Sequence, residues 1–187
     1  MKKVLVLIIL STLQSCLMPP TAQRFNPILE SVEHEGEGVH GGMSYQDSII
    51  QIKWTYTSTA FEFTLLNKTN KSLKVNWEES AYIDENGESN RVFHKGVKFE
   101  DRSQAQPTTV VIRGSVLNDL VSPVGKAVFV RGQYGGWVTR PLFEVNSWTT
   151  TGAKALEDKI RGKTVSILLP IVYEGITREF IFNFKIN

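Results

Sequence analysis

Apolar and polar residues alternate along much of the chain from Ser48 onward, with the period of two that gives a β-strand one buried and one solvated face. The alternation is clearest in segments 50–54, 61–65 and 73–77, where an apolar residue occupies every second position. The pattern places Trp54 in the core, together with Trp77. Further strands are predicted in segments 81–83, 91–93, 108–112, 127–131, 137–143, 164–172 and 178–186.

Polar turn sequences separate the predicted strands. Residues 67–72 (NKTNKS) and Asp84–Gly87 (DENG) have the Asn, Asp and Gly content typical of turns between paired strands. Segment 152–161 is the one stretch with helical character, because its apolar residues fall on one face, and we predict a short connecting helix there. Strands at this spacing predict an all-β fold, as a single β-sandwich of immunoglobulin-like architecture. The last segment, 178–186, would be either a buried strand or a sheet edge.

The part of the chain before the strands has a different composition. Residues 16–44 contain Pro and a glycine-rich run at 35–42, which disfavour regular structure. We therefore predict a flexible tether over 16–44, on which Ile28 and Leu29 could rest against the domain. The folded domain is predicted over 45–187.

Charge and composition exclude some classes of function. The 187 residues include 21 Lys or Arg and 19 Asp or Glu, for a formal net charge of +2. Loss of Lys2 and Lys3 with an amino-terminal segment would leave a neutral chain. Interspersed charges without a basic patch give no electrostatic footprint for nucleic acid, so no nucleic-acid partner is predicted. The sequence contains no phosphate-binding or dinucleotide-binding motif, and no cofactor is predicted.

The amino-terminal residues have the layout of an export signal. Lys2 and Lys3 precede an apolar run from Val4 to Leu10, which is too short for a spanning helix of roughly 20 residues. The run leads to the sequence Leu13-Gln14-Ser15-Cys16, which contains the only cysteine of the protein. These residues resemble the signals of bacterial lipoproteins, although Gln14 is less usual at its position.

The resemblance implies that Cys16 is lipidated. A diacylglyceryl group would be transferred to the thiol, the chain would be cleaved between Ser15 and Cys16, and the new amino terminus would be acylated. Two or three acyl chains anchor a protein stably in a membrane. Leu17 replaces the Asp that signals retention in the inner membrane, so the resemblance favours the outer membrane. The alternatives are an ordinary secretory signal near a free cysteine and an uncleaved anchor.

Two histidines are weak candidates for metal ligands. His34 and His40 lie in one run with Glu35 and Glu37, and imidazole and carboxylate groups are the ligands that zinc prefers. The spacing differs from that of helical HExxH sites. A solvated loop without metal is therefore the favoured interpretation.

Segment 91–107 is polar and unusual, and it carries the candidate binding residues His94, Lys98 and Arg102. One interpretation is a recognition loop for a partner, and the other is a solvated crossover whose charges pair locally. Together with Trp77–Asp84, this run resembles uncharacterised bacterial envelope lipoproteins over roughly residues 44–123. That resemblance implies no specific activity.

Segment Arg131–Arg140 places Tyr134 and Trp137 in a glycine-rich turn between two arginines. Aromatic rings on a loop could stack on sugars or on the apolar surface of a partner, while arginines bind anionic groups. The favoured alternative is a hairpin whose tryptophan folds back onto the core. The sequence does not assign Trp148 to either role.

The sequence predicts no catalytic residues. It contains no G-x-S-x-G or S-x-x-K nucleophile motif, and the neighbouring carboxylates Glu78 and Glu79 would face opposite sides of a strand. We expect a non-catalytic binding or interaction module of the cell envelope, with an envelope protein or a glycan as partner. One alternative is an assembly accessory that pairs through a sheet edge. The other is a hydrolase with an unrecognised site.

Lipidation can be tested with the variant Cys16→Ala. The variant has no thiol to accept a diacylglyceryl group, so we expect it to incorporate no labelled fatty acid and to move to the soluble envelope fraction. Labelling in cells followed by membrane fractionation measures both effects. Unlabelled wild-type protein that remains in the membrane fraction would contradict the prediction.

Overall fold

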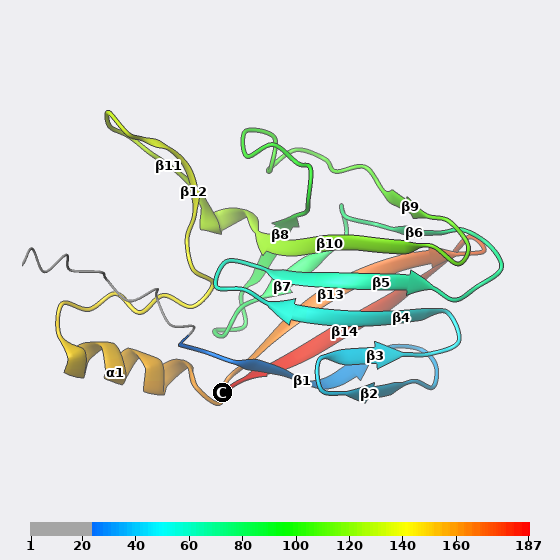
Figure 1. The fold of residues 1–187 in the computed structure, drawn as a ribbon, viewed down its shortest axis with the longest axis horizontal. Coiled ribbons are helices and arrows are strands. Elements are labelled where there is room, and N and C mark those ends of the chain that lie inside the picture. The colour runs from blue at the N-terminus through cyan, green and yellow to red at the C-terminus, as the bar shows by residue number, and fades with distance from the viewer. Residues whose placement is uncertain (1–23) are drawn as a thin grey trace, which may run out of the picture.

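The segments with alternating apolar residues form strands, and their apolar side chains share one core, as the sequence predicts. The computed structural model describes residues 24–187. This part of the chain is mostly β-structure with one α-helix, which confirms the all-β prediction (Figure 1). The elements are β1 (Pro27–Glu33), β2 (Val39–Gly41), β3 (Ser44–Gln46), β4 (Ile50–Tyr56), β5 (Phe61–Asn67), β6 (Leu73–Val75), β7 (Ala81–Ile83), β8 (Ser89–Phe93), β9 (Thr109–Val111), β10 (Val116–Pro123), the 3-10 helix η1 (Val124–Lys126), β11 (Ala127–Val130), β12 (Gly136–Thr139), α1 (Thr150–Ile160), β13 (Thr164–Tyr173) and β14 (Ile176–Ile186).

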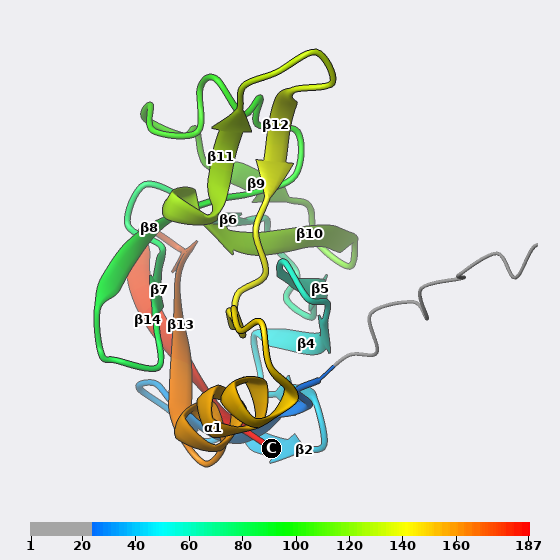
Figure 2. The same cartoon turned by 90° about the vertical axis from the view of Figure 1, so that its left-hand side faces the viewer.

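Twelve strands form one sheet that folds over on itself into two layers (Figure 2). Strands β2, β3, β4, β5 and β10 form one layer, and β1, β14, β13, β7 and β8 form the other. Strand β6 pairs with β13 towards its carboxyl end, and β9 pairs with β6. The pairs Ser122↔Phe93 and Pro123↔Val92 join β10 to β8 and thereby connect the layers.

Aromatic contacts between the two layers form the centre of the core. Phe182 and Phe184 of β14 lie against Trp54 of β4, with ring centres 5.0 and 5.4 Å apart. Phe184 also contacts Phe61 of β5, at 4.6 Å. The predicted core positions of Trp54 and Trp77 are confirmed, because both side chains are fully buried.

Strand β14 is an interior strand of the sheet. It pairs with β1 on one side and with β13 on the other. Every second residue from Phe180 to Ile186 is fully buried. Of the two possibilities that the sequence left open for this segment, the structure selects the buried strand.

The described part of the chain contains strands before the predicted domain boundary at residue 45. Residues 27–33, which we assigned to the tether, form β1 and pair antiparallel with β14. Phe25 and Leu29 are buried. Pro27 is compatible with this strand because it is the first residue, where a missing N–H is tolerated. Short alternation next to a proline gave too weak a signal to predict the strand.

The glycine-rich run forms part of the seam where the two ends of the sheet approach each other. Strands β2 and β3 form a hairpin there. The His34 ring, which follows β1, stacks on Phe180 with ring centres 5.1 Å apart, and Nε2 is hydrogen-bonded to the Tyr45 hydroxyl of β3. A Cβ on Gly38 would lie 2.2 Å from that hydroxyl oxygen, so the close approach requires glycine. The seam thus uses residues that the sequence pattern assigned to a loop.

Two further elements show where periodicity succeeds and where it fails. The predicted connecting helix is α1, and the Thr149 side chain caps it by accepting a hydrogen bond from the Gly152 N–H at 3.1 Å. Strand β10 was not predicted, because Asn118 and Asp119 interrupt the apolar pattern at its centre.

The contact between the layers can be tested with the variant Phe184→Ala. The lost burial and the resulting cavity should lower the free energy of unfolding by about 3–5 kcal/mol. Ile176→Ala, at an exposed position of the same strand, is the matched control and should change it by less than about 0.5 kcal/mol. Urea denaturation measures both values. Equal stability of the two variants would contradict the assigned core.

Candidate functional site

The β11–β12 hairpin forms a small sheet of its own, separate from the twelve-stranded sheet. In its antiparallel register, Phe129 lies opposite Trp137. Figures 1 and 2 show the hairpin projecting from the body of the domain, at the end that also holds α1 and the start of β1. We call this the Arg24 end, because Arg24 precedes β1 there.

Residues of the 91–107 segment support the hairpin from one side. The Arg102 guanidinium lies 4.3 Å from the centre of the Trp137 ring, and the Phe99 ring stacks on the same tryptophan at 6.1 Å. Arg102 also donates a hydrogen bond to the Phe99 carbonyl oxygen at 2.6 Å, which fixes its guanidinium. A cation over an indole ring contributes about 0.5–1 kcal/mol at an exposed site. The structure therefore brings together Arg102 and Trp137, two of the predicted binding residues.

Other apolar side chains of the hairpin are exposed to solvent. The Tyr134 side chain is 95% exposed, and Phe129 is 57% exposed although its edge contacts Trp137. Val130 and Val138 are also exposed. Aromatic rings displayed in this way are the residues that most often anchor protein–protein contacts.

A tight turn and an ion pair fix the two ends of the hairpin. A Cβ on Gly135 would lie 2.2 Å from the Val130 carbonyl oxygen, so the turn closes only with glycine. At the base, the Lys126 ammonium donates to the Glu144 carboxylate at 3.0 Å. This hydrogen bond is the main cause that lowers the pKa of Glu144 below its usual value. The Glu144 carboxylate is therefore ionised at neutral pH.

His94 does not belong to the surface predicted for it. Its ring stacks on the buried Trp77 with centres 4.2 Å apart, and Nδ1 lies 3.3 Å from the Asp119 carboxylate. The His94 side chain is 11% exposed. The same carboxylate accepts the Lys95 backbone N–H at 2.7 Å, so this contact fixes the start of the loop. The sequence could not show this, because Trp77 and Asp119 are distant in the chain.

The remaining candidates have different surroundings. Lys98 is exposed in the same loop as Arg102. His34 is engaged by Tyr45 in the seam, and His40 is exposed on β2. Within residues 24–187, no three His, Cys, Asp or Glu side chains gather in an arrangement that could hold a metal ion. Cys16 lies outside the described residues.

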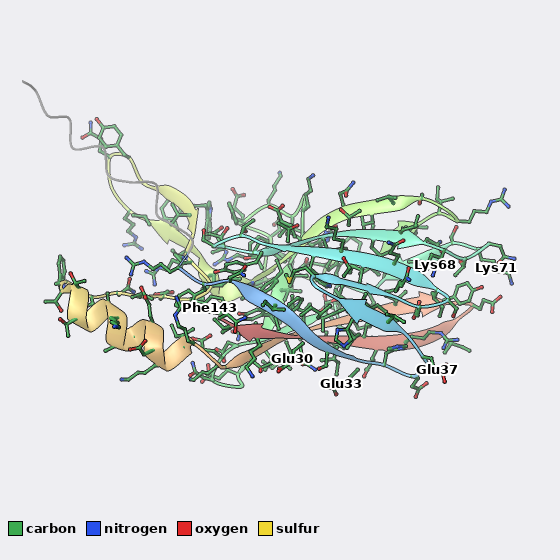
Figure 3. All side chains as sticks on the ribbon, turned by 60° about the horizontal axis from the view of Figure 1, so that its bottom comes forward. Glu30, Glu33, Glu37, Lys68, Lys71 and Phe143 are labelled. Carbon is green, nitrogen blue, oxygen red and sulfur yellow. The ribbon has the colours of Figure 1, made fainter. Side chains whose placement is uncertain are left out.

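A cleft of about 570 Å³ lies at the base of the hairpin. Phe143, which Figure 3 labels at the Arg24 end, contacts Phe25 and Tyr56 with ring centres 5.2 and 5.7 Å apart. Burial raises the pKa of Tyr56 to about 12, so its phenol stays protonated at neutral pH. Arg24 and Arg140 also line the cleft. Sequence reasoning missed it because the lining comes from three distant parts of the chain.

Comparisons with known proteins found no match. No family model matches the sequence, and no curated protein or solved structure is detectably similar to it. None of the helices in the described part of the chain is long and apolar enough to cross a membrane.

The support of the hairpin can be tested with Arg102→Ala. Loss of the cation over Trp137 should speed amide hydrogen exchange in residues 127–139 and lower the free energy of unfolding by about 1 kcal/mol. Lys98→Ala removes an exposed cation from the same loop and is the control. Hydrogen exchange read by mass spectrometry should differ between the two variants. Identical exchange in the hairpin would show that Arg102 does not support it.

Proposed function

We propose that the protein is a lipid-anchored lipoprotein of the bacterial cell envelope that serves as a non-catalytic interaction module. The observation that carries this proposal is the β11–β12 hairpin, which exposes Phe129 and Tyr134 while Arg102 holds Trp137. A hairpin that is already ordered loses little conformational entropy on binding. Its exposed rings are therefore available to contribute contact energy.

The anchor at Cys16 would place the hairpin close to a membrane. Cys16 precedes Arg24 by eight residues, and a fully extended chain of that length spans at most about 29 Å. Because the hairpin projects at the Arg24 end, a lipid on Cys16 would hold it near the membrane surface (Figure 1). On the resemblance of the signal, with Leu17 after the cysteine, we propose the outer membrane.

The proposed partner is another envelope protein. The exposed surface of the hairpin combines aromatic and branched apolar side chains with the exposed Arg131 and Arg140. Aromatic residues and arginine are enriched in protein–protein interfaces, where lysine and acidic residues are depleted. A glycan is the other proposed partner, supported by aromatic rings that could stack on a sugar.

Pairing through a sheet edge is the second candidate function. The outer edges of β11 and β12 pair with no other strand among the described residues. A partner strand could add to either edge through backbone hydrogen bonds. Such pairing would tolerate Tyr134→Ala, because backbone groups carry it, whereas binding through the exposed rings would not.

We also propose that the scaffold is an immunoglobulin-like sandwich and that it has no catalytic activity. Two packed layers with loops at their ends support an immunoglobulin-like sandwich. The continuous pairing from β8 to β10 also fits a barrel-like description. A non-catalytic role is supported by the lack of a known nucleophile motif in the sequence, and a hydrolase with an unrecognised site is the remaining alternative.

Photo-crosslinking in intact cells tests the interaction module. A photoreactive phenylalanine analogue at position 134 should give a specific protein adduct, whereas the same analogue at position 176, also exposed, should not. Tyr134→Ala should then weaken binding of the identified partner by about 2 kcal/mol, as for an interface hot spot. Identical adducts from both positions would contradict a binding hairpin.

A further inference from the structure

Trp148 is the most exposed large apolar side chain in the described part of the chain. It is completely exposed to solvent and immediately precedes Thr149, the cap of α1. A tryptophan carries a large apolar ring, and its transfer out of water lowers the free energy. The position therefore needs an explanation that the fold itself does not supply.

Trp148 lies at the start of α1, at the Arg24 end of the molecule. It lines a shallow depression together with Arg24 and residues of α1. Arg24 is fixed there, since it pairs with Glu157 at 2.7 Å and its carbonyl oxygen accepts a hydrogen bond from Arg161 at 2.7 Å. Figure 1 shows α1 and the start of β1 at the same end of the molecule. The contacts with α1 thus fix Arg24 at the depression that Trp148 also lines.

We propose that Trp148 inserts into the interfacial region of the membrane that carries the lipid on Cys16. This inference rests on the proposed lipid anchor. Arg24 follows Cys16 by eight positions, which span at most about 29 Å, so the Arg24 end stays within reach of the bilayer surface. Tryptophan is enriched at membrane–water interfaces, because its ring is apolar and its N–H can remain hydrated.

The charges around Trp148 indicate that the ring, rather than net charge, carries the contact. Arg24, Lys154 and Arg161 line the depression together with Glu157 and Asp158. These charges are mixed and give no strong attraction to anionic lipid. Docking should therefore depend weakly on ionic strength, unlike the binding of a polybasic segment.

Fluorescence quenching in vesicles tests the proposal. The purified full-length lipoprotein, processed in cells and carrying labelled fatty acid, is reconstituted into vesicles that contain phospholipids brominated near the headgroup. Trp54 and Trp77 are buried and cannot meet the bromine atoms. Trp137 is partly exposed, so it is replaced by Phe in every protein compared, and the parent with Trp148 intact serves as the wild type. We expect tryptophan emission to be quenched in the wild type, and Trp148→Phe to lose most of that quenching. The quenching should be similar at low and high salt.

Ile176→Ala is the matched control. Ile176 is exposed and lies near Glu174, which pairs with Lys71 at 2.6 Å. Figure 3 shows Lys71 at the end opposite Phe143, far from the proposed contact. This variant should retain the quenching of the wild type.

The outcomes separate the docking proposal from the anchor. Labelled protein that enters the vesicles but is quenched equally in wild type and Trp148→Phe would overturn membrane docking and leave the anchor intact. Protein without label would overturn the anchor and the docking together. A photoreactive residue at position 148 that crosslinks in cells only to another protein would likewise overturn docking.

Discussion

The packing of β14 against the opposite layer is the interaction on which the rest of the structure depends. Its phenylalanines fill the space between the layers and contact Trp54 and Phe61. Large aromatic side chains bury much apolar area, and burial of each can contribute about 1.5–3 kcal/mol. Because β14 also pairs with β1 on one side and β13 on the other, it orders the start of the described chain and the Arg24 end.

That arrangement decides which parts of the molecule are free to meet a partner. The long strands pair with one another through backbone hydrogen bonds, and the β11–β12 hairpin lies outside their sheet. Arg102 and Phe99 hold Trp137, so the aromatic tip is presented on a supported element. Because β1 begins at the same end, the lipid that we propose on Cys16 would hold the hairpin close to the membrane.

The sequence predicted most long strands and the helix because their signals are local. It missed β1, where the alternation is short and begins at a proline, and β10, where Asn118 and Asp119 interrupt the apolar pattern. The structure brings together some of the predicted binding residues and separates others. Arg102 and Trp137 meet across the fold, whereas the contact of His94 with Trp77 and Asp119 takes it out of the predicted surface. Such pairings depend on residues far apart in the chain.

The all-β class and the alternating core could be predicted from the sequence, since each depends on residues close together in the chain. The resemblance of residues 1–16 to a lipoprotein signal is equally local, and it stays a prediction. The entry of the described chain into the sheet at Pro27, and the projection of the hairpin at the same end, became apparent only in the folded structure. The same is true of the exposed position of Trp148 at the depression that Arg24 also lines. This difference arises because periodicity reports which face of a strand is buried, whereas neighbours across layers are set by the pairing and packing of distant segments.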